Sequence, residues 1–509
     1  MRLVRRSFLA GAAAGAALPF LSIPGRAAAK PGTLVFGLSS YPPSLLPWVQ
    51  AGTAAGTVNL CVHRGLTSYA PDGTLRGELA EKFDHDDKNG WTFHLRKAVF
   101  HDGSPVTSAD VKWTLEQVAA AGSTAYMAPQ FRGVAAIETP DAATVRIVMK
   151  EPTATLPLWL AQYEMPIVAH GTGIAGKPAI GCGPFTIAAQ DHGVSVTLKA
   201  FPHFYRPGLP KLETLRMVAY ADETARVAAL RTGDVDIIEY VPWNAMAAIE
   251  ANPKLALQTT NGPFMYLTFN GSFKPFADAR VRRAIALGVK REDIVKAVFF
   301  GRGSPLGGMP IPPGTPFYDA KLANGWTYDP TEAKKLLAEA GYAQGFSCTL
   351  LATAQYSMHM QTAVLVQQNL AALGIQVQLA LPDWATRVAL GNRGQYQFAV
   401  GGTSADSNDP DGLSAIIDSS LAPSVARSYD LPVPKIAALF AQGRAEFDPA
   451  KRRAIYDQLQ RVLLAEAPMV SLAWRSQGYG LSRKVSGFYD MPGALTFFSG
   501  TTLEQTSIA

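Results

Sequence analysis

Three aspartates lie close together in the stretch GGTSADSNDPDG, which runs from residue 401 to residue 412. Asp406, Asp409 and Asp411 could bind a metal ion, exchange protons in a reaction, pair with a cationic ligand or face water. As a calcium loop the stretch has Pro410 at the fifth ligand position and no bidentate glutamate at the twelfth, which disfavours a metal. Asp, Asn, Ser, Pro and Gly also form turns, and Asp409-Pro410 fits that simpler interpretation.

Asp406 differs from the other two in its context, because it closely follows the apolar run FAVGG at 398–402. A carboxylate at the end of a predicted buried strand is well placed to meet a ligand in a cleft. No second acid is identifiably opposite it for acid/base work. We therefore interpret Asp406 as a ligand contact, with a turn as the alternative.

Signatures of catalysis and cofactor binding are weak elsewhere in the chain. GTGIAGKP (171–178) has phosphate-loop spacing, but Pro178 stands where a Ser or Thr hydroxyl is needed. The sequence has no Gly-x-Ser-x-Gly elbow, and its eight histidines show no zinc spacing. We expect no cofactor, no metal and no enzyme activity; an exported hydrolase using the aspartates is the competing class.

The elements that must position these residues alternate between strands and helices, which indicates an α/β fold. Asp329-Pro330 and Asp448-Pro449 predict helix starts, with Glu332 completing a capping box after Asp329, and Thr107 with Asp110 predicts another start. The Gly- and Pro-rich run 301–316 is expected to be a surface excursion. The predicted strands are 33–38, 91–96, 145–149, 194–199, 266–270, 375–381 and 469–474.

The first 29 residues are typical of an export signal. Arg5-Arg6-Ser7-Phe8-Leu9 precedes a short apolar stretch and the cleavage-like Ala27-Ala28-Ala29, a pattern of the twin-arginine type. Four arginines of the +6 net charge fall in this acid-free segment, which leaves +2 for the rest. We expect cleavage near Ala29, a periplasmic location and no nucleic-acid partner. Three cysteines, an odd number, leave at least one thiol free.

Blocks along the whole mature sequence resemble one family, the extracytoplasmic family 5 solute-binding proteins of ABC importers, which includes dipeptide-, oligopeptide- and nickel-binding proteins. The blocks occur in family order and are GLTSYAPDGTLRGELAEKF (65–83), WTFHLRKAVFHDGSPVTSADVKWTLEQV (91–118), GCGPFTI (181–187), ETARVAALRTGDVDI (223–237), ARVRRAIALGVKREDIV (279–295), YDPTEAKKLLAEAGY (328–342) and LAALGIQVQL (370–379).

The resemblance implies a two-lobed periplasmic binding protein fold, type II-like, with an extra subdomain in the first lobe. Lobe 1 is expected at 30–262, with the subdomain inserted at about 66–179. Lobe 2 is expected at 263–478, and 479–509 returns to lobe 1. The ligand would be buried between the lobes.

The resemblance also implies the site residues. Asp406 matches an aspartate that pairs with a peptide α-ammonium in relatives, and Trp384 matches a cleft tryptophan that could form a flat apolar wall. Tyr126 and Thr53 match positions that line the pocket. Trp384 could equally belong to the core and Tyr126 to a surface loop.

One position departs from the dipeptide-binding relatives, because Met360 stands where they hold the ligand carboxylate with arginine. A thioether leaves a buried carboxylate unpaired, which is costly. Arg387 or His359 could substitute.

The implied function is a monomeric receptor that delivers a peptide-like solute to an ABC permease served by a cytoplasmic ATPase. A cationic, opine-like or glycoside-like solute, or a sensor without transport, is the alternative.

Overall fold

The computed structural model describes residues 32–509 apart from 50, 87, 88 and 175. The predicted export signal at 1–29 lies outside the described residues. Most of the described strands join a single sheet of eleven strands, in which β13 pairs with β17 beside the main path. The order of that path is β15 (Gln376–Ala380), β14 (Ser347–Leu351), β16 (Phe398–Thr403), β12 (Leu255–Phe269), β17 (Met469–Ser482), β11 (Ile237–Ile238), β1 (Thr33–Leu38), β10 (Thr214–Ala219), β9 (Ser195–Ala200) and β8 (Phe185–Asp191), with β13 at Gly303–Pro305.

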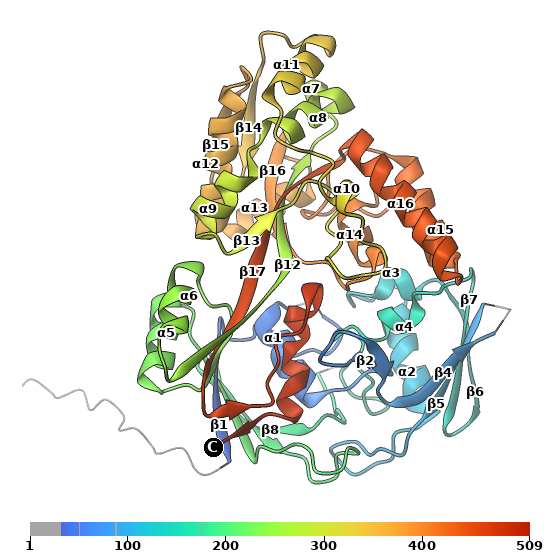
Figure 1. Ribbon diagram of the computed structural model, residues 1–509. Helices are drawn as coiled ribbons and strands as arrows, with labels where there is room; N and C mark the ends of the chain where they lie inside the picture. Colours follow the sequence, from blue (N-terminus) through green and yellow to red (C-terminus); the bar gives the residue numbers. More distant parts are fainter. Residues whose placement is uncertain (1–31, 50, 87–88, 175) are drawn as a thin grey trace, which may run out of the picture. The chain divides into compact units, whose positions relative to one another are not determined.

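Two long antiparallel strands, β12 and β17, run through both halves of this sheet (Figure 1). Their pairing extends from Leu255–Ser482 to Thr268–Met469, with a shift in register between Asn261 and Phe264. Before this shift, β12 pairs with β17 in the part of the sheet where β11 and β1 follow β17. After the shift, β12 pairs with β17 on one side and with β16 on the other. The two strands therefore connect two lobes, as the family resemblance predicts.

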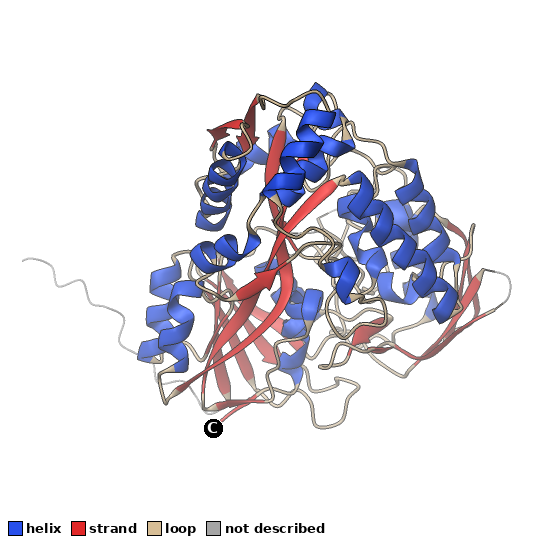
Figure 2. Ribbon diagram, turned by 45° about the horizontal axis from the view of Figure 1, so that its top comes forward, coloured by secondary structure: helices blue, strands red, loops and turns tan. Residues whose placement is uncertain are grey.

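Lobe 2 is the part packed around the apolar core between Phe264 and Trp474. Helices cover its sheet, as Figure 2 shows. In the long helix α16 the buried face repeats at three- and four-residue spacing and includes Leu459, Val462 and Leu463. The helices are α7 (Lys274–Ala277), α8 (Ala279–Gly288), α9 (Arg291–Val298), α10 (Ala320–Ala323), α11 (Pro330–Glu339), α12 (Ser357–Ala371), α13 (Trp384–Asn392), η1 (Pro410–Leu413), α14 (Ser414–Ile417), α15 (Pro434–Ala445) and α16 (Pro449–Glu466).

Lobe 1 is the remainder of residues 32–509 and contains several apolar cores. One of them, between Trp48 and Cys182, packs against a separate four-stranded sheet. That sheet has the order β4 (Ala80–His85), β5 (Gly90–Leu95), β7 (Thr144–Met149) and β6 (Val134–Asp141). The other elements are α1 (Thr53–Val62), β2 (Thr67–Tyr69), β3 (Leu75–Gly77), α2 (Ser108–Ala119), α3 (Ala128–Phe131), α4 (Leu156–Trp159), α5 (Glu223–Thr232), α6 (Trp243–Glu250), β18 (Val485–Ser486), η2 (Gly493–Glu504) and β19 (Ser507–Ile508).

The prediction of a surface excursion at 301–316 holds for 312–316, which form a loop at the surface, and is wrong for 303–311. Gly303–Pro305 forms β13 against β17, and Leu306–Ile311 is buried in lobe 2. The glycines in this run allow close packing, because a Cβ on Gly308 would lie 2.1 Å from the carbonyl oxygen of Leu322. At Gly308, glycine therefore marks contact between backbones instead of a solvent-exposed turn.

The predicted helix starts are confirmed, with one change in detail. Asp329 caps α11 by accepting hydrogen bonds from the amides of Thr331 and Glu332, and Asp448 caps α16. The Glu332 carboxylate, expected to complete a capping box, instead lies 3.2 Å from the Lys335 ammonium. A solvent-exposed carboxylate one turn before a lysine can form this pair at little cost.

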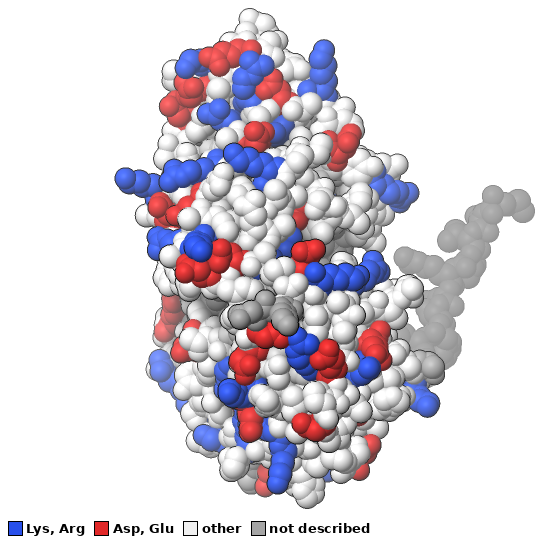
Figure 3. All heavy atoms as spheres, turned by 90° about the vertical axis from the view of Figure 1, so that its right-hand side faces the viewer, with Lys and Arg blue, Asp and Glu red and all other residues white. Residues whose placement is uncertain are grey.

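The described residues contain no helix long and apolar enough to cross a membrane. On the face drawn in Figure 3, acidic and basic side chains are interspersed.

Candidate functional site

The loop after β16 holds its three aspartates in three different environments. Asp409 receives two hydrogen bonds from the guanidinium of Arg452, at 2.5 and 2.8 Å, and its carboxylate also accepts from the Asp411 amide at the start of η1. This bidentate pair fastens the loop to α16. Asp409 is therefore a structural residue, in agreement with the turn interpretation of Asp409-Pro410.

Asp411 is buried and has a cationic partner as well. Its carboxylate lies 3.1 Å from the Arg444 guanidinium on α15 and accepts a hydrogen bond of 3.3 Å from the indole of Trp159 on α4. Burial raises the pKa of Asp411 to about 6, and the charge of Arg444 opposes that rise. Because Trp159 belongs to lobe 1, this aspartate links the two lobes.

Asp406 differs from both, since no arginine or lysine among the described residues pairs with it. Its Oδ1 accepts a 2.8 Å hydrogen bond from the Tyr126 hydroxyl of lobe 1, and its Oδ2 accepts none from a described residue. Burial raises the pKa of Asp406 to about 6, while the bond from Tyr126 lowers it. The environment favours a cation that could share this carboxylate.

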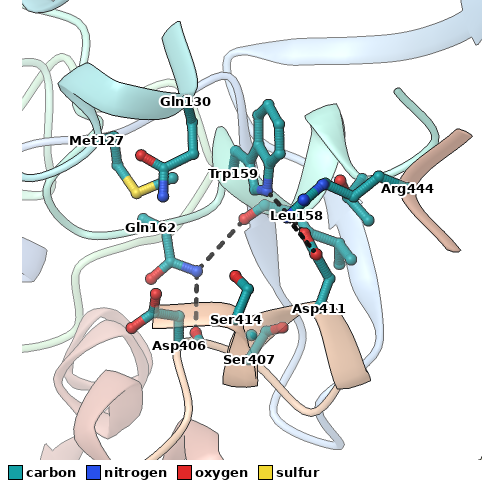
Figure 4. A pocket seen from close by; sticks show the side chains of 12 residues that line it. Met127, Gln130, Leu158, Trp159, Gln162, Asp406, Ser407, Asp411, Ser414 and Arg444 are labelled. Carbon is teal, nitrogen blue, oxygen red and sulfur yellow. Dashed lines mark hydrogen bonds and ion pairs between the residues drawn. The ribbon is translucent and has the colours of Figure 1, made fainter. Parts of the chain in front are cut away.

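A cavity of about 30 Å³ lies beside Asp406 and is lined by both lobes (Figure 4). Gln162 of lobe 1 donates a 2.9 Å hydrogen bond from its side-chain amide to the Asp406 carbonyl across this cavity. The volume suits one water molecule or one ammonium group. A wider cleft of about 760 Å³ lies on the other side of the loop, where Ser407, Asn408 and Asp409 line it.

A second acid, Glu164, lies near Asp406 on the lobe 1 side. Its side chain is 1% exposed, and its Oε2 has no hydrogen-bond partner among the described residues. Burial, followed by the charge of Asp406, raises the pKa of Glu164 to about 8. The same two carboxylates, after burial, raise the pKa of Tyr126 well above its usual value. The Glu164 carboxyl is therefore protonated near neutral pH, and a cation bound at Asp406 would favour the ionised form of both acids.

Two of the four predicted site residues meet here and two do not. Tyr126, predicted to line the pocket, and Asp406, predicted to pair with a ligand ammonium, are hydrogen-bonded across the lobes, a contact that the sequence did not predict. Trp384, half-buried at the start of α13, packs its ring against Tyr356 and His359 instead. Thr53 begins α1, and its carbonyl accepts a hydrogen bond from the Thr57 hydroxyl. Within the described part of the chain, neither Trp384 nor Thr53 forms a hydrogen bond with Asp406.

Several residues of this region were missed by sequence reasoning. Gln162, Trp159 and Glu164 lie about 240 residues before the aspartates, and no local pattern connects them with the loop. A carboxylate in the apolar context LAQYEMPIV was the one available signal, because charged residues are rarely buried without a reason. Met360 is half-buried on α12, its neighbour in sequence His359 is buried, and Arg387 on α13 is buried as well.

Comparison with protein families matches residues 74–423 to the family described as bacterial extracellular solute-binding proteins, family 5. Among characterised relatives, the glutathione-binding protein GsiB of Escherichia coli K12 is 28% identical over 487 residues, which cover 92% of this chain and 94% of GsiB.

Solved structures show the same fold. The protein AgaA of A. tumefaciens R10, solved in complex with agropinic acid, is 41% identical with a TM-score of 0.84, covering 94% of this chain and 99% of AgaA. The periplasmic binding protein DppA of Helicobacter pylori, solved with the peptide STSA, is 22% identical with a TM-score of 0.81, covering 94% and 98%.

Proposed function

Because the chain belongs to the bacterial extracellular solute-binding proteins of family 5, we propose that it is the solute receptor of an ABC importer. It takes up a peptide-like solute with a positively charged amine between its lobes and delivers it to a membrane permease served by an ATPase. The observation that carries the ligand class is Asp406, which alone among the three aspartates of its loop lacks a cationic partner in the described residues.

The chemistry of recognition follows from the environment of Asp406. An ammonium group can form a charge-assisted hydrogen bond with Oδ2 while Tyr126 keeps Oδ1. Such a bond is strong where water is excluded, and it cancels part of the cost of burying the carboxylate. The solute enters when the lobes move apart and stabilises the closed form by its higher affinity for that form. Thr53 and Trp384 are proposed as more distant walls.

The proposal extends to the parts of the chain that position the site. Lobe 1 comprises residues 30–262 with an inserted subdomain at about 66–179, lobe 2 comprises 263–478, and 479–509 returns to lobe 1. The first 29 residues direct export through the twin-arginine route and are removed near Ala29. The mature protein acts as a monomer in the periplasm.

The test compares peptides that differ only at the N-terminus. By calorimetry, the dipeptide Ala-Phe is expected to bind at least ten times more tightly than N-acetyl-Ala-Phe, and Asp406→Asn should abolish this preference. Asp409→Asn is the matched control: it loses the Arg452 pair but should retain the preference. If the acetylated peptide binds the unsubstituted protein equally well, the ammonium role of Asp406 is wrong.

A second candidate ligand is an organic acid of the kind bound by AgaA. The 41% identity with AgaA over 94% of this chain favours it. Agropinic acid is therefore included in the same titrations. Tight binding of agropinic acid by both the unsubstituted protein and Asp406→Asn, with no binding of Ala-Phe, would replace the peptide class by the acid class.

A further inference from the structure

Several buried arginines form no ion pair with a carboxylate among the described residues, and two of them also make few hydrogen bonds within the protein. Arg387 on α13 and Arg475 on β17 are each 2% exposed, and neither forms an ion pair with a described carboxylate. Buried charge of one sign is costly unless a counter-charge or a full set of hydrogen bonds compensates it. The two side chains therefore need an explanation.

Arg475 has few hydrogen bonds for a buried guanidinium. Its Nη1 donates to the Tyr240 hydroxyl and to the Met358 sulfur, both at 3.3 Å, and its Nε is enclosed without a partner. No described residue accepts a hydrogen bond from its Nη2. The guanidinium carbon lies 5.8 Å from the centre of the Tyr240 ring and 6.0 Å from that of Trp243. Aromatic faces and a thioether surround the charge, and no carboxylate of the described chain forms an ion pair with it.

Arg387 is similarly incomplete. Its Nη2 donates to the carbonyl oxygen of Val400, its Nε is enclosed without a partner, and its guanidinium carbon lies 5.1 Å from the centre of the Trp384 ring. Burial lowers the pKa of Arg387, and no carboxylate opposes that effect. The Trp384 ring, predicted as a flat wall of the ligand site, thus covers a guanidinium.

The two arginines lie near one common side chain, the imidazole of His359. Burial, then the charges of Arg387 and Arg475, lower the pKa of His359 to about 3. The imidazole is therefore neutral at physiological pH, and the two guanidinium groups are the positive centres that surround it. Its Nδ1 is enclosed without a partner as well.

A third arginine of lobe 2 shows what a structural arginine looks like in this chain. Arg282, also 2% exposed, donates to the carbonyl oxygens of four residues, so its guanidinium is fully used within the protein. These are Phe276, Ala277, Glu466 and Ala467. Arg387 has one such carbonyl and Arg475 has none. The contrast argues that the unused donors of Arg387 and Arg475 serve something that is not part of the chain.

We propose that Arg475 and Arg387 form an anion subsite that binds the carboxylate of the peptide-like solute. This inference rests on the proposed function and adds the second charged end of the ligand. A planar carboxylate suits guanidinium donors, which present paired N–H groups in one plane. The subsite supplies the cationic group that is missing at Met360.

The position of Arg475 relates the subsite to both lobes. Arg475 belongs to β17, which crosses between the lobes, and it contacts Tyr240, a lobe 1 residue with the unusual backbone angle φ of 55°. A non-glycine residue in this region is strained, and such strain is concentrated at functional sites. A carboxylate held here would contact the element about which the lobes move.

The sheet register relates the two charged ends of the proposed site. Phe264 of β12 pairs with Thr403 of β16 on one side and with Trp474 of β17 on the other. Two strand spacings separate Thr403 from Trp474 by ~10 Å. Asp406 follows Thr403 by three residues and Arg475 follows Trp474 directly, so the loop with Asp406 and the strand with Arg475 start from neighbouring positions of one sheet.

The experiment uses probes that lack an ammonium group, so that it does not depend on Asp406. N-acetyl-L-phenylalanine carries a carboxylate, and N-acetyl-L-phenylalaninamide does not. Binding is followed by tryptophan fluorescence and by the NMR resonance of the His359 ring, to 50 mM probe at constant ionic strength. We expect the acid to bind at least ten times more tightly than the amide, with a shift of the His359 resonance.

Variants then assign this preference to the two arginines. Arg475→Met and Arg387→Met should each reduce the ratio of acid to amide affinity to near one, while Arg475→Lys should keep part of it. Arg302→Met, which removes an exposed arginine paired with Glu250, should leave the ratio unchanged. Circular dichroism reports whether each variant folds, and the comparison of acid with amide on the unsubstituted protein needs no variant.

Two results on the unsubstituted protein would overturn the proposed subsite: equal binding of the acid and the amide, or no binding of the acid at 50 mM. An undiminished preference for the acid over the amide in both Arg475→Met and Arg387→Met would overturn it as well. Acetate and sulfate are titrated in parallel: displacement of the acid by either ion at equal concentration would show a nonspecific anion effect and also overturn it. The Ala-Phe titration fails independently if the proposed function is wrong, so the two failures are distinguishable.

Discussion

At the scale of single residues, the aspartate loop shows how partners separate three chemically identical side chains. Arg452 and Arg444 neutralise Asp409 and Asp411, whereas the Asp406 carboxylate has, among residues 32–509 that the structure describes, only the hydroxyl of Tyr126. Sequence context predicted Asp406 as the distinct residue, because it follows a buried strand. It could not predict the arginines, which lie 33 and 43 residues further along the chain on other helices.

The same limit applies to the rest of the candidate site. Tyr126 was placed by resemblance to a family, and its bond with Asp406 joins residues 280 positions apart. Arg387 was considered as a replacement for the arginine missing at Met360, but Arg475 was not, since an arginine inside a strand carries no local signal of its role. The positive φ of Tyr240 follows from tertiary packing and cannot be inferred from a tyrosine alone.

Glu164 supports a prediction about pH at this scale. Its pKa is about 8 in the folded protein against an ordinary value of 4.5, so between these pH values the folded state holds more protons than the unfolded state. The stability must then fall as pH rises from about 4.5 to 8. Over this range the free energy of unfolding of the unsubstituted protein should decline by about 1 kcal/mol per pH unit, and Glu164→Gln should remove that decline. Urea unfolding at pH 5, 6, 7 and 8 measures it.

The control for this experiment is Glu116→Gln, since Glu116 is exposed on α2 and forms only a surface pair with Lys112. The Glu116→Gln protein should follow the unsubstituted curve. Parallel pH profiles for the unsubstituted protein and Glu164→Gln would contradict the buried, protonated state of Glu164.

At the scale of elements, local patterns located the strands better than they located their ends. The predicted strand at 33–38 matches β1, and those at 145–149 and 194–199 differ from β7 and β9 by one residue. The run 266–270 was predicted as a short strand, whereas β12 begins at Leu255. The additional residues form a strand because they pair with β17, and this long-range pairing has no local sequence signature.

Gly262, at the register shift of β12, supports a prediction about this crossing. A Cβ at this position would lie 1.8 Å from the backbone carbonyl oxygen of Gly493 in η2, a group that cannot move aside without displacing the C-terminal segment. We expect Gly262→Ala to lower the free energy of unfolding by on the order of 1–3 kcal/mol, as overpacking does. Urea or thermal denaturation measures the loss.

The variant Gly314→Ala is the control that separates the cost of a steric collision from the cost of backbone strain. Gly314 has φ of +87° and no atom within 4 Å of an added Cβ, so the substitution introduces strain alone. Its cost should be about 1 kcal/mol. If Gly262→Ala is no more destabilising than Gly314→Ala, the close approach of β12 and η2 is not a constraint on the fold.

At the scale of the whole molecule, the cysteines mark three separate cores. Cys348 lies in the core of lobe 2, while Cys61 and Cys182 lie in two different cores of lobe 1. All three thiols are free and buried, and burial is the main cause that raises the pKa of each to about 12. The sequence established only that one thiol at least is unpaired. Each cysteine can therefore report the opening of its own core.

These thiols test whether the lobes unfold as one unit. Because β12 and β17 contribute strands to both lobes, loss of either lobe breaks the sheet of the other, and we expect one cooperative transition. No thiol should react with a thiolate-specific reagent such as DTNB in the native protein at pH 8, since little thiolate forms at a pKa of about 12. Mass spectrometry of each labelled cysteine across a urea gradient should give coincident midpoints for all three. Labelling of Cys348 at a lower urea concentration than Cys61 would show that lobe 2 unfolds while lobe 1 remains folded. The strands β12 and β17 would then connect the lobes without coupling their unfolding.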